Sequence, residues 1–132
     1  MSSIAAKDVL IVDDDESIRN LLHAAFKRAG LACDTAADGV YAIEHLSETR
    51  YAVLLLDQMM PRLDGVGVLR QMHSLPMPAE ERPVVVMVTA SADLDQLHAV
   101  GTMVPIVVRK PFDLRELSTL VEDCVTLRRV GH

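Results

Sequence analysis

From Val9 to Asp15 the chain reads Val-Leu-Ile-Val-Asp-Asp-Asp, an unbroken aliphatic run that ends in three carboxylates. Runs that are apolar at every position are typical of strands covered on both faces, whereas half-exposed strands alternate. Three further runs have the same character: residues 52–56, 84–88 and 106–108. A weaker strand is expected around residues 31–36. The sequence therefore predicts a buried parallel sheet.

The segments between these runs have helical periodicity. Apolar residues recur at intervals of three and four over residues 18–29, with Gly30 as a helix stop and Asp15 or Glu16 as the N-cap. A second clear pattern covers residues 114–125. Three further helices are expected around residues 40–48, 65–73 and 92–100.

Strands that alternate with helices predict a parallel sheet with helices on both faces and right-handed crossovers. We expect a flavodoxin-like, doubly wound α/β fold with five strands in the order 2-1-3-4-5 and five helices. A chain of 132 residues suits one compact domain. We therefore expect residues 1–132 to form a single domain, with its core between about residue 8 and about residue 127.

Composition excludes several classes of function. The formal net charge of −6 disfavours binding to nucleic acid or to an anionic membrane, because both favour basic patches. No apolar stretch approaches the roughly 20 residues of a membrane helix, and the N-terminus lacks a signal-peptide pattern. Cys33 and Cys124 have no metal-type spacing, which favours free thiols in a reducing compartment. We expect a cytoplasmic protein, with Arg128 and Arg129 serving the dipole of the last helix and solubility.

Each strong strand is followed by a residue suited to phosphoryl chemistry. Residues 13–15 follow the first strand, Asp57 the third, Thr89 the fourth and Lys110 the fifth. The carboxyl ends of parallel strands lie along one edge of a sheet, so these side chains are expected to meet. Crowded carboxylates repel one another unless one is protonated or a cation lies among them, and Mg²⁺ prefers such oxygen ligands. A carboxylate can also attack phosphorus and form an aspartyl-phosphate, whose charge the metal and Lys110 would neutralise.

Four segments together resemble the signature segments of the receiver domains of two-component response regulators, and the resemblance extends from about residue 9 to about residue 125. It implies that Asp57 accepts a phosphoryl group from a sensor histidine kinase or a histidine phosphotransfer domain, followed by slow hydrolysis of the aspartyl-phosphate. It also implies that Thr89 and Lys110 contact the phosphoryl group and that the Lys110–Pro111 peptide is cis. The segments are Val12–Asp14, Asp57–Gly65, Val88–Ala90 and Lys110–Phe112.

The same resemblance implies a metal site. Asp13 and Asp14 correspond to the acidic pair that binds Mg²⁺ together with Asp57, with Mn²⁺ as a possible substitute. Met59 corresponds to the residue that offers its main-chain carbonyl to the metal, so its side-chain type is not important for that role.

One position departs from the family pattern. Many receivers have Tyr or Phe three residues before the lysine, where this chain has Val107. In those receivers the aromatic side chain moves together with the residue at the position of Thr89 when the site is phosphorylated. Val107 has no ring, and a β-branched side chain has few rotamers, so this coupled movement is not expected here. Together with Pro105 and Arg109, this departure indicates a specialised face formed by the fourth helix, fifth strand and fifth helix. We expect a downstream protein partner or a second copy of the chain to bind this face.

Three alternative functions fit the sequence less well. A pseudo-receiver, which acts without phosphorylation, would lack an acidic residue or the lysine, and none is missing here. A flavin-binding domain would need a phosphate-cradling loop after the first strand, where residues 13–16 are acidic. A haloacid-dehalogenase-type phosphatase has a second Asp two residues after the nucleophile, where this chain has Met59.

Overall fold

The computed structural model describes residues 5–90 and 106–130. Its strands form one five-stranded sheet in the order β2-β1-β3-β4-β5, and every neighbouring pair is parallel. Both the predicted strand order and the parallel sheet are confirmed. The strands are β1 (Ala5–Val12), β2 (Cys33–Ala36), β3 (Thr49–Asp57), β4 (Val84–Thr89) and β5 (Ile106–Arg109).

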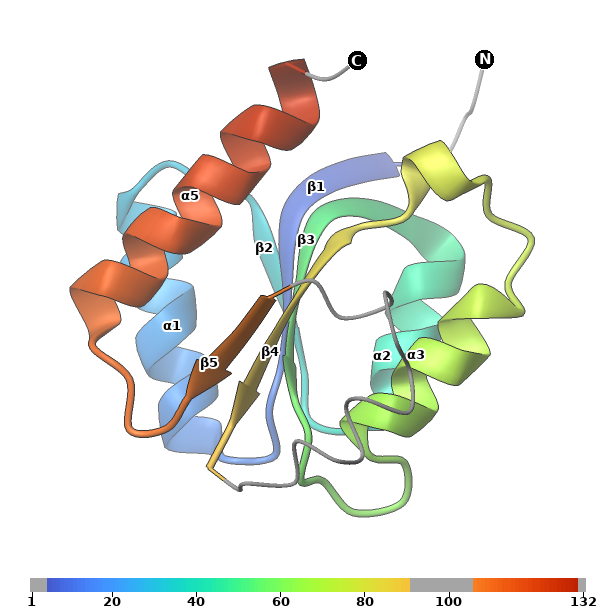
Figure 1. Cartoon of the computed structure of the whole chain (residues 1–132), viewed down its shortest axis with the longest axis horizontal. Coiled ribbons are helices and arrows are strands. Elements are labelled where there is room, and N and C mark those ends of the chain that lie inside the picture. Colours follow the sequence, from blue (N-terminus) through green and yellow to red (C-terminus); the bar gives the residue numbers. More distant parts are fainter. Residues whose placement is uncertain (1–4, 91–105, 131–132) are drawn as a thin grey trace.

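Helices cover both faces of the sheet. α1 and α5 lie on one face, and α2 and α3 lie on the other (Figure 1). Four of the five expected helices are present, and the one expected at residues 92–100 lies outside the described residues. None of the helices described here is long and apolar enough to cross a membrane. The helices are α1 (Glu16–Arg28), α2 (Gly39–Glu48), α3 (Gly65–His73), the short 3₁₀ helix η1 (Ala79–Glu81) and α5 (Leu114–Val130).

Each of the four described α-helices begins after an aspartate. The carboxylate of that aspartate accepts a hydrogen bond from a main-chain amide of the first turn, which satisfies a donor that the helix leaves unpaired. Asp15 caps α1 in this way, as predicted, and Gly30 follows the end of α1 with a φ of 84°. The other capping residues are Asp38, Asp64 and Asp113.

The core consists of two apolar layers, one on each face of the sheet. Along β1, Leu10 and Val12 belong to the layer under α2 and α3, whereas Val9 and Ile11 belong to the layer under α1 and α5. All four side chains are at most 1% exposed. The uninterrupted apolar run therefore reflects a strand that is buried on both faces.

Two arginines at the end of α5 contact β1 and the segment that precedes β4. Arg129 forms an ion pair with the buried carboxylate of Asp8 in β1, and Arg128 donates hydrogen bonds to the main-chain carbonyls of Glu80 and Arg82. The interpretation of these arginines as residues for the helix dipole and solubility missed this tertiary role. The contacts lie at the amino end of β1, away from the edge described next.

Candidate functional site

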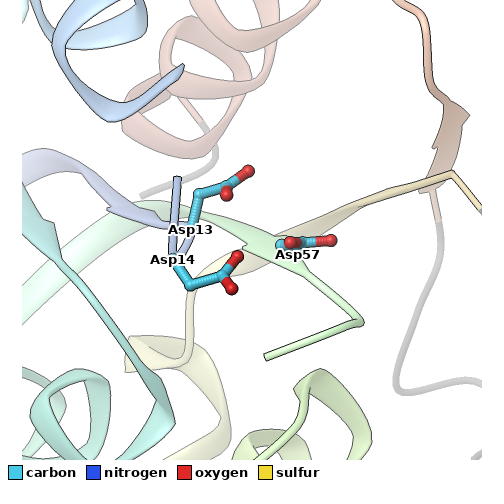
Figure 2. A group of neighbouring side chains, drawn as sticks. All are labelled: Asp13, Asp14 and Asp57. Carbon is cyan, nitrogen blue, oxygen red and sulfur yellow. The ribbon is translucent and has the colours of Figure 1, made fainter. Parts of the chain in front are cut away.

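The site lies at the carboxyl edge of the sheet. Asp13 and Asp14 follow β1 directly, and Asp57 is the last residue of β3. Figure 2 shows their three side chains gathered in one place, and one carboxylate oxygen from each lies within 4.8 Å of the others. Asp13 and Asp57 are buried, whereas Asp14 is exposed. The structure therefore brings together the three acids that the sequence analysis grouped.

Lys110, which follows β5, completes the cluster. Its Nζ lies 3.1 Å from Oδ2 of Asp13 and 3.5 Å from Oδ2 of Asp57. Burial alone lowers the pKa of Lys110, but the hydrogen bond to Asp13 and the charges of Asp57 and Asp13 outweigh it and raise that pKa. The lysine therefore stays protonated. The Lys110–Pro111 peptide bond is cis, as the family resemblance implied.

The surroundings of Asp57 disfavour its ionisation. Burial and then the charge of Asp13 raise its pKa from 3.8 to about 6, against the opposing charge of Lys110 and a hydrogen bond from the Met59 amide. Three carboxylates face one ammonium group here, which leaves an excess of two negative charges when all of them are ionised. A divalent cation with a preference for oxygen ligands fits both the charge and the donor atoms.

Asp13 is held by four contacts, one of which is the hydrogen bond that its amide donates to the Ala36 carbonyl at 3.2 Å. Its Oδ1 accepts a hydrogen bond from the Asp15 amide at 2.9 Å, and its Oδ2 faces Lys110. Its main-chain carbonyl accepts a hydrogen bond from Nη1 of Arg19 at 2.8 Å. Arg19 was not predicted as part of the site, because its position on α1 gives no sign that the side chain turns back to the end of β1.

The β3–α3 loop, residues 58–64, folds back on the end of β3. The buried Gln58 accepts a hydrogen bond from the Val66 amide at 2.9 Å through its side chain, and its carbonyl accepts one from the Gly65 amide at 3.0 Å. A Cβ atom on Gly65 would lie 2.8 Å from the Asp57 carbonyl oxygen, so only glycine allows this close return. The Met59 side chain is exposed, and the role of its carbonyl stays a prediction.

Comparison with known proteins identifies the family. The model of the response regulator receiver domain matches residues 9–122. The chain belongs to this family. Response regulator MprA of Mycobacterium ulcerans (strain Agy99) is 34% identical over 109 residues, which is 83% of this chain and 46% of that protein. MprA of Mycobacterium leprae (strain TN) matches with the same identity and coverage. The chain thus spans about half the length of the curated relatives it matches.

Solved receiver structures share the fold. A signal receiver domain from Bermanella marisrubri is 30% identical with a TM-score of 0.77, over 91% of this chain and 98% of that one. A CheY-like receiver from Methanospirillum hungatei JF-1 has a TM-score of 0.83 at 21% identity, over 98% of this chain and 100% of that one. The receiver domain of a sensor histidine kinase from Pseudomonas aeruginosa PAO1 has a TM-score of 0.78 at 22% identity, over 92% and 99% of the two chains.

Thr89 and β5 are the remaining parts of the predicted site and of the expected output face. Thr89 ends β4 and is buried, and its carbonyl accepts a hydrogen bond from the Lys110 amide at 2.9 Å. On β5, Val107 is 39% exposed and Arg109 is also exposed. The helix expected between Thr89 and β5 belongs to the undescribed residues, so the proposed output face is seen only in its β5 and α5 parts.

Proposed function

We propose that this receiver accepts a phosphoryl group on Asp57 from a sensor histidine kinase or a histidine phosphotransfer domain. One observation carries the proposal: a buried carboxylate at the end of β3 lies beside two other carboxylates and 3.5 Å from the Lys110 ammonium. A structural role alone would not require such crowding of acids, because a buried charge is costly unless it is paired.

The nucleophile in this proposal is a carboxylate oxygen of Asp57. It attacks the phosphorus of a phosphohistidine, an O–P bond forms, and the P–N bond breaks as the imidazole leaves with its electron pair. With a pKa of about 6, Asp57 is mostly ionised at neutral pH and therefore competent to attack. Lys110 neutralises charge on the transferred group, and the Thr89 hydroxyl donates a hydrogen bond to one of its oxygens.

Asp13, Asp14 and Asp57 would hold a Mg²⁺ ion, together with the main-chain carbonyl of Met59. The bound ion neutralises negative charge on the acids and on the phosphoryl oxygens, and Mn²⁺ is a possible substitute. The related receiver from Pseudomonas aeruginosa has a magnesium ion coordinated in its active site cleft, which supports this part of the proposal.

The phosphorylated receiver hydrolyses its own aspartyl-phosphate slowly and signals by a change in shape. We expect the output to pass through the face that contains β5 and α5, to a protein partner or to a second copy of the chain. A pseudo-receiver that acts without phosphorylation is disfavoured, because the acids, the hydroxyl and the lysine are all present.

Labelling with acetyl phosphate and Mg²⁺ tests the proposal. Intact-mass measurement should find one added phosphoryl group on the wild type, and hydroxylamine should remove it as it removes an acyl phosphate. Asp57→Asn should not be labelled, whereas Asp123→Asn, which changes an exposed carboxylate on α5, should be labelled like the wild type. Full labelling of Asp57→Asn would refute the assignment.

A further inference from the structure

Arg62 adopts a backbone conformation that is unusual for its type. Its φ is 68°, and it is the one residue other than glycine with a positive φ in residues 5–90 and 106–130. The Leu63 amide donates a hydrogen bond to the Pro61 carbonyl at 2.8 Å, so Arg62 is the central residue of a γ-turn. Turns of this type with a positive φ are rare and strained for a residue with a Cβ atom. Such strain persists only where the surroundings enforce it.

The Arg62 side chain contacts Asp38, the residue that caps α2. Nε and Nη2 of Arg62 lie 3.0 Å and 2.5 Å from Oδ2 of Asp38. The other oxygen of the same carboxylate accepts the Tyr41 amide hydrogen bond at 3.0 Å. The Arg62 guanidinium also lies 5.5 Å from the centre of the Tyr41 ring, within the range of a cation–π contact. One buried carboxylate therefore joins the start of α2 to the β3–α3 loop.

A second close contact joins the same two segments. A Cβ atom on Gly39, the first residue of α2, would lie 2.4 Å from the Leu63 carbonyl oxygen. The backbone of the loop therefore rests directly on the start of α2. The loop begins next to Asp57, and the amide of Met59 donates a hydrogen bond to Oδ1 of Asp57 at 3.3 Å. Any movement of the turn at Arg62 would thus be passed to main-chain atoms that adjoin the acidic site.

We propose that Arg62 is a positioning residue, which acts through Asp38 to hold the β3–α3 loop in the strained turn that aligns Asp57 and the Met59 main chain. The inference rests on the proposed function, because it concerns the same metal and phosphoryl site. The Arg62 side chain is 55% exposed. Although the Asp38 side chain is only 12% exposed, solvent at the guanidinium screens the pair, which should therefore contribute little to global stability. The fork of the guanidinium instead fixes a geometry, which lysine would not reproduce.

The variant Arg62→Gly distinguishes a role in positioning the site from a role in stabilising the fold. Glycine adopts a positive φ without strain but cannot bind Asp38, so the melting temperature should be unchanged or higher. The dissociation constant for Mg²⁺, measured by titration calorimetry, should rise about 10-fold, the effect typical of losing a residue that orients metal ligands. The rate constant for labelling by acetyl phosphate at saturating Mg²⁺ should also fall. Arg28→Ala, which removes an exposed arginine at the end of α1 without placing a glycine in the helix, should leave all three quantities unchanged.

Asp38→Asn tests the same contact from its other side. Asparagine is as good an N-cap as aspartate, so α2 keeps its start, but the charge that binds Arg62 is lost. Its Mg²⁺ affinity should fall about as much as that of Arg62→Gly, and the double variant should be no weaker than either single variant. Arg62→Lys, which keeps the charge without the fork, should have an intermediate affinity.

The outcomes distinguish this inference from the proposed function. If Arg62→Gly binds Mg²⁺ and is labelled like the wild type, the positioning role is wrong, while labelling of wild type but not Asp57→Asn still supports phosphorylation. If Arg62→Gly melts well below the wild type, the contact stabilises the fold and the positioning role is also wrong. If the wild type is not labelled, the proposed function fails, and calorimetry of Mg²⁺ binding still decides whether Arg62 positions the acids.

Discussion

Replacing Asp57 with asparagine should stabilise the metal-free receiver at neutral pH. Burial and the charge of Asp13 raise the pKa of Asp57 from 3.8 to about 6. A rise of that size corresponds to about 3 kcal/mol, since each tenfold change in a protonation equilibrium corresponds to ~1.4 kcal/mol. This free energy opposes folding whenever Asp57 is ionised. Asparagine has a similar shape and no charge, so Asp57→Asn should avoid most of it.

The effect should depend on pH with a definite sign. Because the pKa of Asp57 is higher in the folded protein, the folded state binds more protons than the unfolded state between about pH 4 and about pH 6. The free energy of unfolding of the wild type should therefore fall as the pH rises through this window. Asp57→Asn lacks this contribution, so the two proteins should be similar near pH 4 and differ most above about pH 6.

Urea denaturation followed by circular dichroism, in EDTA and at several pH values across this window, measures the difference. Asp123→Asn is the matched control, because it removes an exposed carboxylate from α5 and should not change the pH profile. If Asp57→Asn is no more stable than the wild type at neutral pH, then burial and the charge of Asp13 do not disfavour the ionised Asp57. The case for a divalent cation among the crowded acids would then lose its physical basis.

Three further outcomes are expected. Millimolar Mg²⁺ should raise the melting temperature of the wild type, because only the folded state has the metal site, and it should raise that of Asp14→Ala less. An unchanged melting temperature of the wild type would contradict the metal site. Gly39→Ala should destabilise the fold by about 1–3 kcal/mol in urea denaturation, since its Cβ would clash with the Leu63 carbonyl; a neutral effect would mean that the loop can move away. Beryllofluoride, which mimics the phosphoryl group, should change the self-association or partner affinity of Val107→Ala as it does that of the wild type, and should change that of Thr89→Ala less. The reverse result would contradict a switch that works without an aromatic ring.

The sheet and the acidic cluster were predictable because both depend on local sequence. A run such as Val9 to Val12 is apolar throughout since both faces of β1 are covered, and the alternation with helices indicates parallel strands. The strand order was expected from the flavodoxin-like fold class rather than from the alternation alone. The meeting of Asp13, Asp57 and Lys110 needs only the rule that parallel strands end at one edge. None of these inferences requires knowledge of a side-chain conformation.

Contacts between distant side chains were not predictable in this way. Arg62 and Asp38 are 24 residues apart, and Arg129 and Asp8 are 121 residues apart. A turn with a positive φ is expected at glycine or asparagine, so an arginine gives no signal of it. Basic residues are common at the ends of helices, so Arg129 by itself gives no sign of a partner. Its pairing with Asp8 depends on how far α5 extends back along the sheet. Such roles become visible only when the packing of the segments is known.

The hydrogen-bond pattern constrains how phosphorylation can change the receiver. Lys110 contacts both Asp13 and Asp57 through its side chain, and its amide is bonded to the Thr89 carbonyl. A phosphoryl group on Asp57 would attract both the Lys110 ammonium and the Thr89 hydroxyl, so the ends of β4 and β5 should move together. Val107 lies on β5, the strand that Lys110 directly follows, but it has no ring that could exchange between buried and exposed positions. The change should therefore reach the surface through the backbone of β5, where the exposed Arg109 directly precedes the lysine.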